Sequence, residues 1–166
     1  MELTEERYKK IADFFLKKPI RLRMLRFVYH IFPLVIAAAY IILLVALAFA
    51  AGLPELLKAL MIPAAAFLAV TVFRRVLNLE RPYEKLSITP LMERNKSGQS
   101  FPSRHCASAF VISTVILNYN AVIGALLLVV SLCIAVSRIL AGVHFTRDAA
   151  VGSLIGLLFG LVIFLL

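Results

Sequence analysis

Long apolar stretches separated by polar segments dominate the pattern along the chain. No charged residue occurs from Phe27 to Leu53. At 1.5 Å per residue, a helix of this length crosses about 30 Å of hydrocarbon. A second apolar stretch runs from Leu56 to Leu77, with its charged residues near its two ends. The pattern therefore predicts two transmembrane helices joined by a short turn.

The second half of the chain predicts three more helices. After the polar loop 78–104, residues 105–137 again contain no Lys, Arg, Asp or Glu, and Asn118-Tyr119-Asn120 divides this stretch in two. A last apolar helix follows Asp148. The helix 105–117 would be only ~20 Å long. We therefore expect its start to lie below the membrane surface, in a cavity walled by the other helices.

The N-terminal 26 residues form a basic arm. Within it, Tyr8, Ile11, Ala12 and Phe15 are spaced i, i+3, i+4 and i+7, which places them on one face of a helix. Lysines occupy much of the remaining surface. The arm is thus predicted to be an amphipathic helix lying in the membrane interface, and a solvated arm is the alternative.

Glycine recurs every fourth residue in the last predicted helix, at Gly152, Gly156 and Gly160. Such a ridge of small residues lets two helices approach closely. We therefore expect these glycines to serve packing.

Together these elements predict an all-α integral membrane bundle. It has five transmembrane helices in a domain of residues 27–166, preceded by the amphipathic interfacial helix in residues 1–26. The composition agrees, because 62% of the 166 residues are hydrophobic and 16% are charged, against about 45–50% and 25% in soluble domains. The pattern does not indicate an oligomeric state.

The net charge of +9 is confined to segments beside the apolar stretches. Eight of the 18 basic residues lie in the first 26 positions, and seven lie between Arg74 and Arg104. A charge at the centre of a bilayer costs at least ~2.5 kcal/mol, so this distribution is typical of a membrane protein. We expect membrane lipids as partners, with anionic headgroups attracted to the arm, and no nucleic acid.

Polar residues beside the apolar stretches form three clusters. Any one of them has an ordinary explanation, such as arginines anchoring a helix end. Taken together, they indicate a site for an anion with several oxygens, because guanidinium groups bind phosphate through paired hydrogen bonds and stay charged. The clusters are Arg74 with Arg81-Pro82, then Pro102-Ser103-Arg104-His105, then Ser137-Arg138 with His144 and Asp148.

The same clusters contain groups suited to catalysis. His144 and Asp148 are four residues apart, so they share one face if the last helix begins near His144. A carboxylate that holds one imidazole nitrogen leaves the other free to attack phosphorus. His105 is then available as the acid for the leaving group. Ser103 can add a hydroxyl, and the first N–H groups of the following helix favour an anion.

At these residues the sequence resembles the type 2 phosphatidic acid phosphatase family, which shares its site with vanadium haloperoxidases. The family pattern is K-x6-R-P, then P-S-G-H, then S-R-x5-H-x3-D. The second and third blocks here read PSRH and SRILAGVHFTRD. Arg74 stands where the family usually has lysine, and Arg104 stands where glycine is usual.

The resemblance implies roles for eight residues. His144 is the nucleophile that forms a phosphohistidine, Asp148 orients it, and His105 protonates the leaving oxygen. No metal or other cofactor is needed. The residues implied to bind phosphate are Arg74, Arg81, Ser103, Arg104 and Arg138.

The resemblance further implies a phosphatase acting on a lipid phosphate or diphosphate in a cell membrane. Its candidate substrates are undecaprenyl diphosphate, phosphatidic acid and phosphatidylglycerol phosphate. A membrane protein that binds or transports a phospholipid without catalysis is the alternative, and a haloperoxidase is a third reading that the membrane spans disfavour. Basic residues favour the cytoplasmic side, and two spans return the chain from the arm to the loop 78–104 on that same side. The active sites of family members in bacterial membranes, however, generally face outward. We expect an extracytoplasmic site.

Overall fold

The computed structural model describes residues 4–92 and 97–166. These residues form helices and connecting loops, with no strand among them, which confirms the all-α prediction. The helices are α1 (Glu5–Leu16), α2 (Pro19–Ala50), α3 (Leu53–Leu77), α4 (Pro82–Lys85), α5 (Arg104–Tyr119), α6 (Ala121–Leu140) and α7 (Thr146–Leu161), followed by the 3₁₀ turn η1 (Val162–Leu165).

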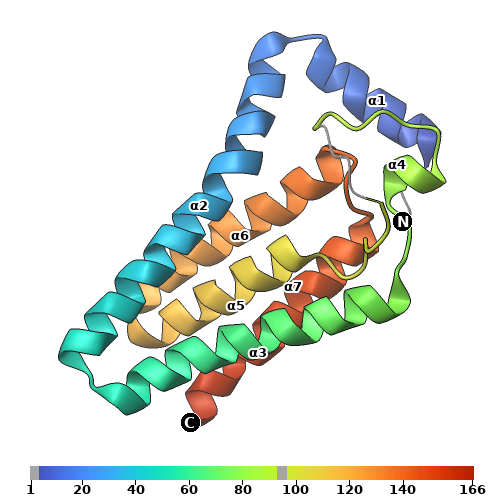
Figure 1. The fold of residues 1–166 in the computed structure, drawn as a ribbon. Coiled ribbons are helices and arrows are strands. Elements are labelled where there is room, and N and C mark those ends of the chain that lie inside the picture. The colour runs from blue at the N-terminus through green and yellow to red at the C-terminus, as the bar shows by residue number, and fades with distance from the viewer. Residues whose placement is uncertain (1–3, 93–96) are drawn as a thin grey trace.

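The bundle is organised around α5, which packs against α2, α3, α6 and α7 (Figure 1). Nine of its 16 residues are buried, more than in any neighbouring helix. It ends at the predicted break, where the Asn120 side chain accepts a hydrogen bond from the Ile123 N–H at 3.0 Å and caps α6. The chain thus reverses direction and returns as α6 to the end of the bundle where α5 began.

Four helical stretches are long and apolar enough to cross a membrane, as far as residues 4–92 and 97–166 are concerned. At 16 residues, α5 is about 24 Å long and falls short of the usual 17–25 residues. The membrane bundle is therefore confirmed, but the count of five spans is not. The four stretches are Pro19–Ala50, Leu53–Lys85, Ala121–Leu140 and Thr146–Leu165.

The first apolar stretch belongs to a longer helix than the sequence predicted. The helix α2 begins at Pro19 rather than near Phe27, and it runs without interruption into the apolar part. Proline suits this first position because its missing N–H would be unpaired there in any case. The chain bends between Leu16 and Pro19, and residue 26 lies within α2.

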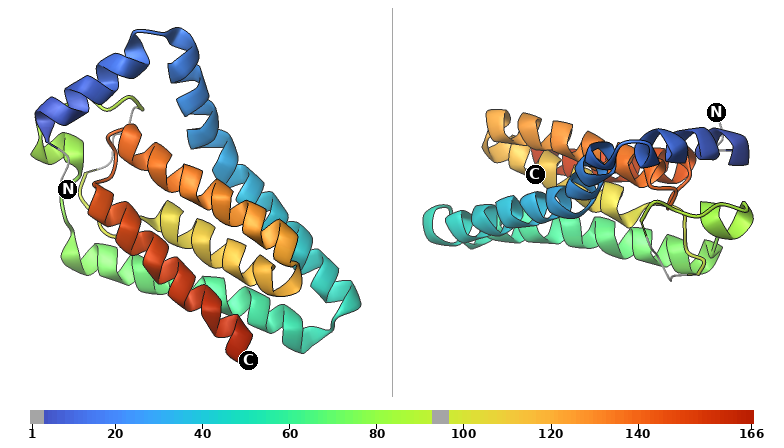
Figure 2. Two further views of the ribbon diagram at one scale, coloured as in Figure 1. Left: turned by 180° about the vertical axis from the view of Figure 1, so that it is seen from behind. Right: turned by 90° about the horizontal axis from the view of Figure 1, so that it is seen from above.

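The amphipathic helix predicted in the arm is α1, and its apolar face packs against the protein. Tyr8, which is 1% exposed, packs with Phe145 from the turn before α7. Ile11 and Ala12 pack against the same pair. Figures 1 and 2 place α1 across the end of the bundle, beside α4. The periodicity identified an apolar face correctly, and the protein itself covers that face.

The glycine ridge of α7 packs against α5, as predicted. A Cβ atom at Gly156 would lie 2.4 Å from the Ala107 carbonyl oxygen, and one at Gly152 would lie 2.5 Å from the Ser103 carbonyl oxygen. Both contacts are with backbone, which cannot move aside as a flexible side chain could. The two helix axes can therefore approach this closely only because these positions lack side chains.

Replacing a ridge glycine should separate α7 from α5. We expect Gly156→Val to destabilise the purified protein in detergent by ~1–3 kcal/mol, the usual cost of overpacking. The measurement is reversible unfolding followed by circular dichroism. Leu154→Phe is the control, because it enlarges an exposed side chain on the same helix. Equal stability of Gly156→Val and the parent would mean that the ridge does not set the helix spacing.

Candidate active site

One end of the bundle collects the ends of four helices. The carboxyl ends of α3 and α6 meet the amino ends of α5 and α7 there. A small cavity of about 40 Å³ lies among them. Its lining is mostly cationic or ionisable, and includes six of the eight predicted site residues. The lining residues are Tyr29, Arg74, Arg81, Arg104, His105, Arg138, Val143 and His144.

Arg74 fastens the long loop to the last turn of α3. Its Nη1 donates to the carbonyl oxygens of Ser100 at 3.1 Å and of Pro102 at 2.7 Å. The side chain is buried, and its Nε has no hydrogen-bond partner among the residues described. A buried donor of this kind costs free energy unless something accepts its hydrogen bond. Arg74 also lines the cavity, so its guanidinium is placed to contact an anion there.

Arg81 lies where the loop folds back over the site. Its Nε donates to the Gly98 carbonyl at 3.0 Å. Glu84 fixes the same fold, because its carboxylate accepts from the Arg81 N–H at 2.8 Å and from the Gly98 N–H at 2.9 Å. Gly98 has a φ of +62°, and a Cβ there would lie 2.6 Å from Asn78 Oδ1. A side chain at this point would be strained, so glycine is favoured.

Arg138 enters the cavity from the last turn of α6. Its guanidinium lies over the Tyr29 ring, with Cζ 3.7 Å from the ring centroid, and Nη2 donates to the Tyr29 carbonyl at 3.1 Å. Both residues are almost fully buried. The contact orients the guanidinium before any ligand arrives. Sequence analysis missed Tyr29, because an aromatic residue within an apolar stretch carries no signal of a polar role.

His144 and Asp148 meet at the start of α7. His144 lies in the turn before the helix, not in its first turn, and its Nδ1 is 3.5 Å from Asp148 Oδ2. That oxygen also accepts hydrogen bonds from the Phe145 N–H at 3.0 Å and from the Ser100 hydroxyl. Ser100 Oγ is itself 3.5 Å from His144 Nδ1. Ser100 was missed because a serine in a polar loop has no distinguishing pattern.

Burial keeps the imidazole of His144 neutral. The side chain is almost fully enclosed, and this desolvation lowers the pKa of His144 from its usual 6.5 to about 4, although the hydrogen bond to Asp148 acts in the opposite direction. Lowering the pKa of a histidine favours the uncharged ring at neutral pH. An uncharged ring has a lone pair on the nitrogen that faces away from the carboxylate. It can therefore act as a nucleophile.

Ser103 and Arg104 stand at the amino end of α5. The Ser103 N–H donates to the Asp148 carbonyl at 2.9 Å, which joins the second and third predicted clusters. The buried Ser103 hydroxyl has no hydrogen-bond partner within the described part of the chain. Arg104 is the first residue of α5, and its φ is not positive. Among the residues described, the non-glycine residues with a positive φ are Asn78 and Gln99. An arginine therefore adopts this backbone conformation without the strain of a positive φ.

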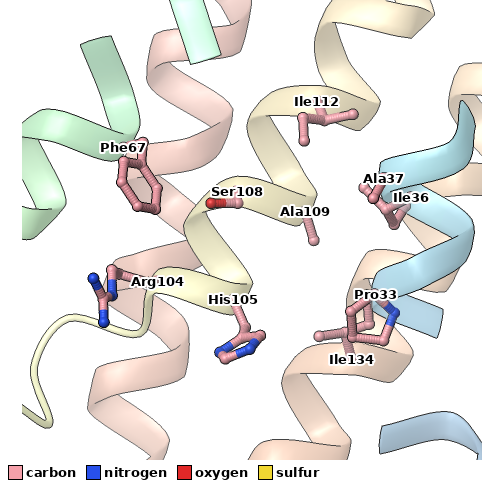
Figure 3. A pocket seen from close by; sticks show the side chains of 10 residues that line it. All are labelled: Pro33, Ile36, Ala37, Phe67, Arg104, His105, Ser108, Ala109, Ile112 and Ile134. Atoms are coloured by element: carbon pink, nitrogen blue, oxygen red, sulfur yellow. The ribbon is translucent and has the colours of Figure 1, made fainter. Parts of the chain in front are cut away.

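A larger apolar cavity of about 360 Å³ adjoins the polar one (Figure 3). Arg104 and His105 line both cavities, and Figure 3 shows their side chains at one end of the apolar space. The Arg104 guanidinium lies 5.8 Å from the ring centroid of Phe67 on α3. The other lining residues are Pro33, Ile36, Ala37, Ser108, Ala109, Ile112 and Ile134.

The third histidine and the two cysteines of the chain line neither cavity. His30 is exposed on α2, with its ring against Tyr29. Cys106 is buried and Cys133 is half-buried, and both are free thiols. Among the residues with a described position, no group of three or more His, Cys, Asp or Glu could hold a metal ion.

Two solved structures share this fold. The crystal structure of Aquifex aeolicus LpxE is 24% identical, and the match covers 87% of this chain and 94% of that one, with a TM-score of 0.63. A transmembrane PAP2-type phosphatidylglycerolphosphate phosphatase from Bacillus subtilis is 19% identical. There the match covers 96% of this chain and 83% of that one, with a TM-score of 0.71.

Sequence comparison gives the family. The chain is 30% identical over 103 residues to the bacitracin transport permease protein BcrC of Bacillus licheniformis. This match covers 60% of the chain and 51% of BcrC, so it spans about half of that relative's length. A family model described as the PAP2 superfamily matches residues 39–166, which is most of the chain. This membrane protein therefore belongs to the PAP2 superfamily.

Proposed function

We propose that this protein is a lipid phosphatase that removes the terminal phosphate of a lipid phosphate or diphosphate through a phosphohistidine on His144. One observation carries the proposal: a buried, neutral imidazole held by a carboxylate faces a small cavity lined by four arginines. Such a cavity suits a phosphate group, and an apolar space adjoins it for a lipid tail. The fold shared with a phosphatidylglycerolphosphate phosphatase supports the same activity.

The arginines would hold the phosphate before and during reaction. The guanidiniums of Arg74, Arg81 and Arg138 are each anchored to a backbone carbonyl, so they are positioned without the ligand. Ser103 would donate its unpaired hydroxyl, and the first N–H groups of α5 would face the same anion. Charge-assisted bonds that are fixed in advance stabilise the transition state most where water is excluded.

The reaction would take place in two steps. His144 Nε2 attacks phosphorus, the bond to the leaving oxygen breaks, and His105 gives that oxygen a proton. Asp148 stabilises the positive charge on the His144 ring. His105, now neutral, then takes a proton from water, the resulting hydroxide oxygen attacks phosphorus, and the N–P bond breaks to release phosphate. Both histidines return to their starting states.

Arg104 favours a diphosphate lipid among the candidate substrates. Its side chain lines both the polar and the apolar cavity, so it lies where the group joining phosphate to tail would pass. A lipid monophosphate such as phosphatidic acid places an ester oxygen there, whereas undecaprenyl diphosphate places a second charged phosphate. Phosphatidylglycerol phosphate has its other phosphate further along the headgroup. A fourth guanidinium suits the additional charge of a diphosphate.

The same proposal gives α5 the role of a fifth crossing helix with a recessed start, and an extracytoplasmic site. At 16 residues, α5 is shorter than α2, α3 and α6, against which it packs, so its amino end and the arginines there would lie below the surface of the bilayer.

BcrC carries the name of a transport protein, which favours the non-catalytic alternative of phospholipid binding or transport. Release of inorganic phosphate from a lipid phosphate, with a chelator present, distinguishes the two.

The first test separates the two histidines. We expect His144→Ala to be inactive on every substrate, because each one needs the nucleophile. His105→Ala should lose about 10²–10⁴-fold on a lipid monophosphate, yet keep much more activity on p-nitrophenyl phosphate, whose phenolate leaves without a proton. His30→Ala is the matched control, since it removes an exposed imidazole. If p-nitrophenyl phosphate instead rescues His144→Ala, the two roles are reversed.

The second test concerns Arg104. With a diphosphate and a monophosphate that carry the same prenyl tail, Arg104→Gly should lower kcat/KM for the diphosphate by about 10²-fold and leave the monophosphate within about 3-fold. The comparison within one variant cancels any loss of folded enzyme. A fall of equal size on both substrates would show that the guanidinium binds the terminal phosphate instead.

The third test measures the protonation of the nucleophile. The chain has three histidines, so the variant with both His30→Gln and His105→Gln retains only the His144 ring. Its pKa, followed by NMR in detergent, should lie near 4, and the neutral form should persist down to that pH because burial opposes protonation. A midpoint at or above 6.5 would mean that the Asp148 carboxylate outweighs burial.

A further inference from the structure

Tyr8 joins α1 to the turn that carries His144. The Tyr8 hydroxyl donates to the Ala141 carbonyl oxygen at 3.2 Å and accepts from the Leu91 N–H at 2.9 Å. Leu91 also donates to the Ala141 carbonyl at 3.1 Å. One hydroxyl thus connects three segments that are far apart in the sequence: α1, the loop before the site, and the end of α6.

The Tyr8 ring fits against the same turn. Gly142 has a φ of +74°, and a Cβ there would lie 2.6 Å from Tyr8 Cε2 and Cζ. Tyr8 also packs against Phe145, whose N–H binds the Asp148 carboxylate. The ring therefore contacts the turn on both sides of His144. Burial raises the pKa of Tyr8 above its usual value, so the hydroxyl keeps its proton and can donate.

A second contact holds α1 to the loop. The Glu5 carboxylate accepts a hydrogen bond from the Ser87 N–H at 3.0 Å, and Ile11 and Ala12 pack near Leu86 and Ile88. All of these α1 residues precede the stretch 39–166 that the family model matches. The family model therefore does not include the α1 side of these contacts.

We propose that α1 is a latch over the turn Ala141–Phe145 and that Tyr8 is a positioning residue that sets the placement of His144. The proposal rests on the phosphatase function proposed above. His144 lies between the points where Tyr8 contacts the turn, at Ala141 and Gly142 on one side and Phe145 on the other. Without the latch, the turn is held by fewer contacts and water reaches the buried imidazole.

Two consequences distinguish positioning from a purely structural role. A displaced nucleophile slows phosphoryl transfer for every leaving group alike, because a shift of about 1 Å costs up to 10²-fold in rate. The binding of substrate is less affected, because Tyr8 is not among the residues that line either cavity of the site. A hydrated turn also lets the His144 ring take up a proton more easily.

The test is Tyr8→Phe, which removes the hydroxyl and keeps the ring. We expect kcat to fall about 10-fold on both a lipid monophosphate and p-nitrophenyl phosphate, with KM within about 2-fold. In the background that retains only His144, the NMR titration midpoint should move from near 4 upward toward 6.5. Tyr8→Leu, which also removes the ring contact, should show both effects more strongly.

Tyr40→Phe is the matched control. It removes a tyrosine hydroxyl that donates to the Ala59 carbonyl at 3.0 Å, and neither residue lines the site. It should leave kcat and the His144 titration unchanged. The latch is wrong if Tyr8→Phe keeps kcat within 2-fold and the parent midpoint, or if Tyr40→Phe loses as much activity. Failure of the unsubstituted protein to release phosphate would instead overturn the phosphatase function, and the titration would still report on the latch.

Discussion

The close contact between α5 and α7 is the interaction on which the rest of the site depends. Gly152 lets the α7 backbone approach the Ser103 carbonyl, and the Ser103 N–H bonds to the Asp148 carbonyl. The amino ends of the two helices are thereby held side by side. Because unpaired N–H groups at both ends point outward, the contact concentrates partial positive charge where the arginines gather. A wider helix spacing would separate the serine from the histidine–aspartate pair.

Buried charge is the second constraint. Arg74, Arg81 and Arg138 are almost fully buried, which is unfavourable unless hydrogen bonds compensate for the lost water. Backbone carbonyls supply part of that compensation, and they also fix the direction of each guanidinium. The loop between α3 and α5 is therefore a structural part of the site. An anion would complete the pairing, so the energetic cost of burying the arginines favours binding of phosphate.

In the proposed mechanism, environment divides one chemical group between two roles. His144 is enclosed and held by Asp148, whereas His105 is exposed at the junction of the polar and apolar cavities. Desolvation keeps the first ring neutral, as a nucleophile requires. The second ring remains accessible to solvent, from which an acid can regain its proton. The two residues are chemically identical, so only their surroundings can give them different roles.

The sequence by itself determined the apolar helices, the reversal at Asn118–Asn120, the glycine ridge and the residues gathered at the site. Absence of charge, helical spacing and motif spacing are local properties that can be read along the chain. The bilayer narrows the structures they allow, because a spanning segment must pair its own backbone hydrogen bonds. Only the tertiary structure decided what covers the apolar face of α1 and which groups hold the site residues, such as Tyr29 for Arg138 and Ser100 for Asp148. Periodicity shows that a face is apolar but does not identify its partner. Which part of the protein covers an apolar face depends on contacts between residues far apart in the chain, and a local pattern holds no information on such contacts.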